Sequence, residues 1–182
     1  MKYLKILLVT AVCLAGCQNV EETEKRPSAC TEQSACEAVP ADNDFEQITF
    51  DEAIDIFKNG DSAILYFGFP KCPWCQEAVP ILKEEAAKAG KEVLYVQTRD
   101  DELNRLYTDE QRDEIEPYIS EYMEKDDDGN PAIFVPLVIN VKDGKAVAGH
   151  VGTVDGHDAH ERSMTEDEKK QLTEIYSSLL NE

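Results

Sequence analysis

Residues 63–75 read AILYFGFPKCPWC, an apolar run joined to a pair of closely spaced cysteines. The apolar run, residues 63–69, is typical of a central β-strand that is buried on both of its faces. Cys72 and Cys75 follow it, and Pro73 between them suits the first turn of a helix, because proline has no N–H to leave unpaired there. We therefore predict a strand, then the two cysteines, then a helix that begins beside them.

This placement favours thiol–disulfide chemistry. A thiolate, and not a thiol, attacks a disulfide, and the start of a helix lowers the pKa of a cysteine through its unpaired N–H groups and its dipole. Lys71 is expected to add positive charge. Two cysteines three positions apart can close a disulfide and reopen it by exchange. We predict that Cys72 is the nucleophile and the more exposed thiol, and that Cys75 is the buried resolving thiol.

Two other interpretations of the cysteine pair were weighed, a zinc site and a structural disulfide. Zinc needs four ligands, and no second pair of cysteines or histidines stands at the usual spacing, so no metal is expected. The cluster His150, His157 and His160 with nearby acids lacks regular spacing and is expected to be a solvated loop, a weak divalent site being the alternative. A structural disulfide that closes so short a loop would stabilise little.

The sequence on either side of this stretch alternates strand and helix signals. Capping boxes at Thr49…Glu52 and Thr165…Glu168 mark helix starts, and Asp143-Gly144 between two apolar runs marks a hairpin. The expected strands are 47–50, 63–69, 92–97, 133–141 and 145–151. The expected helices are 51–58, 73–88, a mostly helical polar segment 100–130, and a last helix from the second capping box to about residue 180.

Over residues 45–180 the chain resembles the thioredoxin-like family. The resemblance rests on the strand–CxxC–helix unit, on Pro80 five residues after Cys75, and on Phe134-Val135-Pro136-Leu137 before the hairpin. It implies an α/β, thioredoxin-like fold, with a central mixed sheet flanked by helices and a helical insertion before the cis-proline strand. It also implies that Pro136 is the cis-proline facing the cysteines.

The resemblance further implies that the Val135 backbone pairs with an extended substrate. Trp74, between the two cysteines, is expected to form an apolar lip for a substrate, a core position being the alternative. One departure concerns the position six residues before Cys72, where thioredoxins carry a buried aspartate and this chain has Tyr66. The proton acceptor for Cys75 is therefore unassigned. The glutathione-binding pattern of glutaredoxins is absent, and no cofactor is expected.

The N-terminal segment has the pattern of a targeting signal. Two lysines, an apolar run too short to cross about 30 Å of hydrocarbon, and Leu14-Ala15-Gly16-Cys17 resemble a lipoprotein signal whose cysteine is lipidated. We expect a signal peptide at 1–16, a lipid-anchored flexible acidic tether at 17–44, and a thioredoxin-like domain at 45–182. The protein would stand on the extracytoplasmic face of the cell membrane. With Cys17, the chain looks most like bacterial thioredoxin-like lipoproteins and bacteriocin-transport-accessory-type proteins.

The expected tether contains Cys30 and Cys36. A local disulfide without chemistry, a second redox pair that exchanges with the main site, and a metal-binding or reduced pair all remain open.

Composition limits the partners. The 182 residues carry a formal net charge of −20, which disfavours nucleic acid because phosphate binding needs a basic face. Hydrophobic residues make up 42%, which excludes a wholly disordered acidic chain. The predicted function is that of a membrane-tethered thiol–disulfide oxidoreductase acting on protein or peptide disulfides or dithiols, with an electron-donor or acceptor partner. Its charge would favour basic clients. The alternative is a non-catalytic accessory lipoprotein that binds a secreted peptide such as a bacteriocin.

Overall fold

The computed structural model describes residues 44–182. The expected signal peptide, nearly all of the expected tether, and Cys17, Cys30 and Cys36 lie outside these residues. Among residues 44–182, no helix combines the length and the apolar character that crossing a membrane would need.

The described chain folds into helices and strands in the alternating order that the sequence predicts, with an additional short pair of strands, 124–125 and 131–132, before the last two strands of the sheet. The helices are α1 (Phe50–Asn59), α2 (Pro73–Ala89), α3 (Asp109–Ile119), the short 3-10 helix η1 (Ser120–Tyr122) and α4 (Glu166–Asn181). The strands are β1 (Glu46–Ile48), β2 (Ala63–Gly68), β3 (Val93–Gln97), β4 (Glu124–Lys125), β5 (Pro131–Ala132), β6 (Leu137–Lys142) and β7 (Lys145–Val151).

Five of these strands form the central mixed sheet, in the order β1-β3-β2-β6-β7. Strands β1, β3 and β2 are mutually parallel, whereas β6 runs antiparallel to β2 and β7 antiparallel to β6. Strands β4 and β5 make a separate small hairpin. The predicted fold class, an α/β arrangement with a central mixed sheet flanked by helices, is confirmed.

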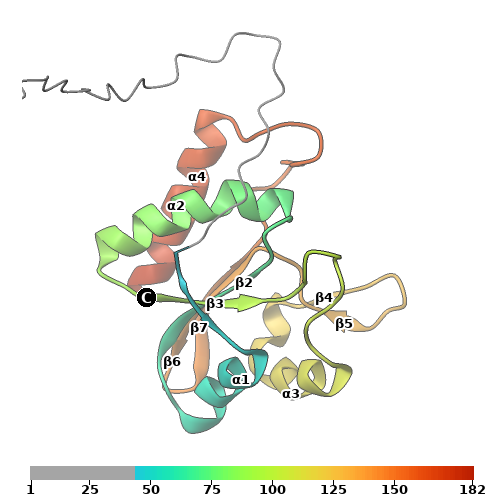
Figure 1. The fold of residues 1–182 in the computed structure, drawn as a ribbon. Helices are drawn as coiled ribbons and strands as arrows, with labels where there is room; N and C mark the ends of the chain where they lie inside the picture. The colour runs from blue at the N-terminus through green and yellow to red at the C-terminus, as the bar shows by residue number, and fades with distance from the viewer. Residues whose placement is uncertain (1–43) are drawn as a thin grey trace, which may run out of the picture. The chain divides into compact units, whose positions relative to one another are not determined.

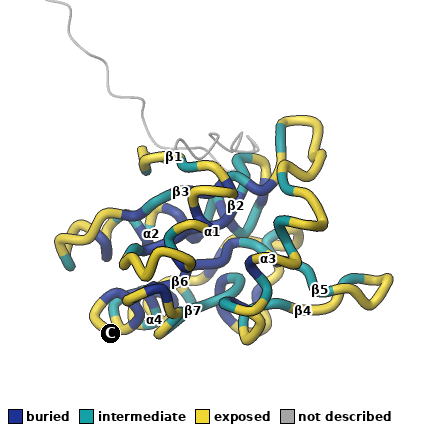
Figure 2. The backbone as a smooth tube through the Cα atoms, turned by 90° about the horizontal axis from the view of Figure 1, so that it is seen from below, coloured by how far each residue is buried: buried dark blue, intermediate teal, exposed yellow. Residues whose placement is uncertain are grey.

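Two helices cover each face of this sheet: α2 and α4 lie on one side, and α1 and α3 on the other (Figure 1). Strand β2 is buried in the middle, as Figure 2 shows. Because successive side chains of a strand point to opposite faces, Ile64 and Tyr66 join the cluster under α2 and α4, while Leu65 and Phe67 join the cluster under α1 and α3.

The helix starts follow the sequence signals closely. Both predicted capping boxes form, Thr49 with Glu52 at α1 and Thr165 with Glu168 at α4. A third, Thr108 with Gln111, opens α3 and was not predicted. Helix α2 ends at Gly90, whose φ of +62° is a left-handed conformation that glycine adopts without a steric penalty.

Two expected segments are wrong in extent. The segment 100–130 is not mostly helical: α3 and η1 cover its middle, while residues before α3 form a loop in which the Asp100 carboxylate accepts the backbone N–H groups of Glu102 and Asn104. The strand expected over 133–141 begins only at Leu137, directly after Pro136, which has no N–H to give to the sheet.

Candidate active site

Cys72 and Cys75 stand where β2 has ended and α2 begins. Cys72 is the N-cap of α2, with extended backbone angles, and its Sγ accepts the backbone N–H of Cys75 at 3.2 Å. Pro73 occupies the first turn, as predicted. In α2, which is described throughout, no acidic residue lies in that turn. A negative charge there would oppose a thiolate, so its absence matters in a chain this acidic.

The pKa of Cys72 is lowered from that of an ordinary thiol. The largest cause is a hydrogen bond from the Cys75 thiol, and the backbone N–H groups of Cys75 and Trp74 act in the same direction, against the effect of burial. Lys71 was expected to contribute charge, but it is exposed and its ammonium donates to the Asp101 carbonyl oxygen at 2.6 Å. The thiolate is thus stabilised chiefly by Cys75 and the helix start.

Both thiols are free and buried, Cys72 being 2% exposed and Cys75 1%. Cys72 is thus the more exposed thiol, as expected, but only slightly, and what separates the two sulfurs is chiefly their electrostatics. Burial raises the pKa of Cys75, and the hydrogen bond and charge of Cys72 raise it further. The geometry favours Cys72 as the thiolate and Cys75 as the thiol, as the predicted roles require.

The Val135–Pro136 peptide bond is cis, and it lies against the cysteines. The Cys72 thiol points at the Val135 carbonyl oxygen, with Sγ and O 3.8 Å apart. Val135 is half-buried, whereas Phe134 beside it is 43% exposed. The structure thus brings Pro136 and Val135 to the site from a segment about sixty residues further along the chain, as the resemblance implied. Whether the Val135 backbone binds a substrate remains a prediction.

Trp74 is half-buried and is held by the segment that follows β7. Its indole N–H donates to the His157 carbonyl oxygen at 3.4 Å, and the His160 ring meets it edge-on with the centroids 4.7 Å apart. Part of the side chain is thus packed against this segment. Its role as a lip for substrate remains a prediction.

The segment 152–164 that holds Trp74 is more deeply packed than the sequence suggested. Thr153, Val154 and His157 are buried, so the expected solvated loop is wrong for these residues, and Met164, which follows the loop, is buried as well. The Met164 N–H donates to the Glu77 carboxylate on α2 at 2.6 Å. The segment is rich in glycine and charged residues, and its few apolar residues do not follow the spacing of a helix or a strand. No pattern in the sequence therefore indicated that it is buried.

The three histidines of this region are engaged separately. His150 contacts the Thr153 carbonyl oxygen at 2.6 Å, and the His157 ring contacts the Thr153 hydroxyl at 2.7 Å and the Arg162 carbonyl oxygen at 3.0 Å. Among residues 44–182, no group of three or more histidine, cysteine or acidic side chains is placed to hold a metal ion.

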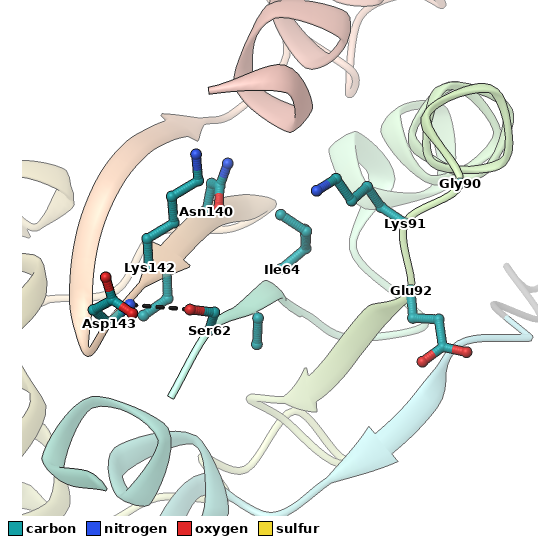
Figure 3. Close-up of a pocket in the computed structure, with 10 residues that line it drawn as sticks. Ser62, Ile64, Gly90, Lys91, Glu92, Asn140, Lys142 and Asp143 are labelled. Atoms are coloured by element: carbon teal, nitrogen blue, oxygen red, sulfur yellow. Dashed lines mark hydrogen bonds between the residues drawn. The ribbon is translucent and has the colours of Figure 1, made fainter. Parts of the chain in front are cut away.

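A hollow of about 560 Å³ lies at the other end of β2, away from the cysteines. It is lined by the start of β2, the turn after α2 and the end of β6, and Figure 3 shows the Ser62 hydroxyl accepting the Asp143 backbone N–H across its edge. The residues that line this hollow include neither a cysteine nor a histidine.

No family model matches the chain, and no curated protein sequence matches it. Solved structures that resemble it are thioredoxins. Desulfothioredoxin from Desulfovibrio vulgaris Hildenborough, in its reduced form, is 18% identical, with a TM-score of 0.41 over 75% of this chain and 98% of that one. Mitochondrial thioredoxin 3 from Saccharomyces cerevisiae, oxidised, is 15% identical, with a TM-score of 0.38 over 59% and 83% of the two chains.

The oxidised thioredoxin from Plasmodium falciparum is 16% identical, with a TM-score of 0.38 over 73% of this chain and 98% of its own. Because the identities and TM-scores are low, the chemistry of this chain is inferred from its own residues.

Proposed function

We propose that the chain is a thiol–disulfide oxidoreductase that acts on protein or peptide disulfides through Cys72 and Cys75. The observation that carries the proposal is the position of Cys72: its sulfur caps α2, accepts the Cys75 N–H at 3.2 Å and has a lowered pKa. The cis-proline segment lies directly opposite. A thiolate held at a helix start is the species that attacks disulfides.

In the reductive direction the reaction has two steps. The Cys72 thiolate attacks one sulfur of the client disulfide, so that a mixed disulfide forms and one client thiolate leaves. Cys75 then loses its proton and attacks the Cys72 sulfur, which closes the Cys72–Cys75 disulfide and releases the second client thiolate. Two electrons pass to the client, and an external dithiol partner must restore the pair. The reverse sequence oxidises a client dithiol, and the reduction potential sets the direction.

The proposal extends to location and clients. The charged start, short apolar run and Cys17 support a lipid anchor that places the domain on the extracytoplasmic face of the membrane, where disulfides persist. The net charge of −20 supports basic clients, because opposite charges speed encounter. Binding of a secreted peptide without turnover is the competing function.

The test is reduction of a disulfide-linked two-chain peptide of the insulin type, with dithiothreitol as the electron donor. The wild type should accelerate reduction, Cys72→Ser should abolish the acceleration, and Cys75→Ser should accumulate a mixed disulfide with the client. Cys30→Ser combined with Cys36→Ser is the matched control, and it should remain active if the tether cysteines take no part. A folded wild type without turnover, or activity that survives Cys72→Ser, would refute the proposal.

A further inference from the structure

The buried cluster that contains Cys75 includes three tyrosines and no carboxylate. The tyrosines are Tyr66 of β2, Tyr95 of β3 and Tyr176 of α4. The Tyr66 hydroxyl makes a hydrogen bond with the Cys75 sulfur, which opposes the effect of burial on the Cys75 thiol. The residue that departs from the thioredoxin pattern is therefore in contact with the resolving sulfur.

Gly68 leaves the space that the Tyr66 hydroxyl fills. A Cβ added at position 68 would lie 2.2 Å from the Tyr66 hydroxyl oxygen and 2.5 Å from the ring carbon that carries it. Real Cβ atoms do not approach other atoms this closely, so any larger residue would displace the hydroxyl. Gly68, the last residue of β2, is thus small enough to leave room for the side chain of Tyr66 on the same strand.

Tyr176 supplies a second hydroxyl in the same place. Its side chain is fully buried, and within residues 44–182 its hydroxyl has no hydrogen-bond partner. Burial raises the pKa of Tyr176, and negative charge on Cys75, which shares its buried cluster, raises it further. Buried hydroxyl groups are nearly always paired, so an unpaired one beside a redox pair calls for an explanation, and a catalytic role is one that the site offers.

We propose that the Tyr66 and Tyr176 hydroxyls are paired hydrogen-bond donors to the Cys75 sulfur when it becomes a thiolate. The inference rests on the proposed function, because a Cys75 thiolate arises there only when the mixed disulfide is resolved. In this state Tyr176 gains the partner that it lacks when Cys75 is a thiol.

The two hydroxyls act as donors and not as bases. Burial raises the pKa of both tyrosines, so neither can accept the Cys75 proton at neutral pH. When Cys75 attacks Cys72, the S–H bond of Cys75 and the bond between Cys72 and the client sulfur break, and the Cys72–Cys75 bond forms. The proton goes to the departing client thiolate, so no buried carboxylate is needed to carry it.

Several titratable groups share the buried cluster of this sulfur or contact a member of it, and they bear on any pH profile. They are Cys72 on α2, Tyr66 on β2, Tyr95 on β3 and Tyr176 on α4, with the His150 ring of β7 lying edge-on to Tyr176. Of these, Tyr66 and Tyr176 are the ones whose hydroxyls the proposal assigns to Cys75.

The test uses a coloured leaving group and needs no client. Cys72 is converted to its mixed disulfide with 2-nitro-5-thiobenzoate, and Cys75 then displaces the coloured thiolate at fixed pH. Tyr66→Phe and Tyr176→Phe should each slow the release about tenfold or more, which is the factor for one hydrogen bond to a charged group. Gly68→Ala should slow it in the same way. Tyr118→Phe, the same change in the cluster on the opposite face, is the control and should match the wild type.

A second measurement separates donation from packing. A fluorinated tyrosine at position 66 is a stronger donor of nearly the same shape, so it should accelerate the release, whereas a purely structural role predicts no acceleration. Wild-type rates in Tyr66→Phe or in Tyr176→Phe would overturn the proposal. The release of the coloured thiolate requires no client. If the variants slow this release while the wild type fails to reduce the insulin-type peptide, the proposed function is refuted and the role of the two hydroxyls stands.

Discussion

Replacing Cys75 should raise the pKa of Cys72, because the Cys75 thiol is the largest cause of the lowered value. Cys75→Ala removes this side-chain donor but keeps the backbone N–H of residue 75, which lies 3.2 Å from the Cys72 sulfur. A hydrogen bond to a charged group contributes about 1.5–3 kcal/mol, which corresponds to a pKa change of about one to two units. Cys75→Ser keeps an O–H donor and is the matched control, with a smaller change expected.

The assay is the pH dependence of Cys72 alkylation by iodoacetamide in the folded variants, followed by mass spectrometry. A raised pKa moves the midpoint to higher pH and lowers the thiolate fraction at neutral pH, so alkylation there should slow in the order wild type, Cys75→Ser, Cys75→Ala. In the wild type, alkylation near neutral pH should modify Cys72 and spare Cys75, whose pKa is raised. Equal midpoints in all three proteins would show that the helix start alone stabilises the Cys72 thiolate.

Two further predictions concern stability. Leu65 is fully buried in the central strand, so Leu65→Ala should lower the free energy of unfolding, measured by urea titration, by about 2–5 kcal/mol. Leu103→Ala, the control at a side chain that is 49% exposed, should change it by about 0.5 kcal/mol at most. Equal losses in the two variants would contradict the packing. The Arg162 guanidinium donates two hydrogen bonds of 2.7 Å to the Glu168 carboxylate, and these bonds, with the capping contacts of Thr165, lower the pKa of Glu168. The ionised Glu168 therefore stabilises the fold fully above the ordinary carboxyl pKa, and this stabilisation is lost as the pH falls below that value. Glu168→Gln should therefore flatten the acid side of the stability–pH curve, and an unchanged slope would show that the pair contributes nothing.

Local signals predicted most of the elements correctly. The strand at 145–151 has the predicted bounds, and the helix after the cysteines begins at Pro73 as expected and ends at Gly90. The capping boxes at Thr49 and Thr165 form as the sequence indicates. These features depend on residues within one or two turns of each other, so the chain itself carries the information.

The structure of two segments differs from the prediction, because it depends on contacts that the spacing of apolar residues along the chain does not indicate. In residues 100–107 the Asp100 carboxylate binds nearby backbone N–H groups, so this polar sequence forms a loop instead of a helix. In residues 152–164 burial comes from packing beside Trp74 and from the hydrogen bond between Met164 and Glu77 on α2.

The cis-proline was expected only from the resemblance to the thioredoxin-like family. By itself the sequence determined the cysteine pair, its place between a buried strand and a helix, and the α/β class. Spacing, apolar periodicity and capping residues act locally, which is why these features can be predicted from the chain alone. Only the tertiary structure decided that both sulfurs are buried, that the Cys72 sulfur lies 3.8 Å from the Val135 carbonyl oxygen, and that Tyr66 and Tyr176 share a buried cluster with Cys75. Those facts depend on strands and helices separated by many residues, and burial and charge at a sulfur are set by whatever the fold packs around it.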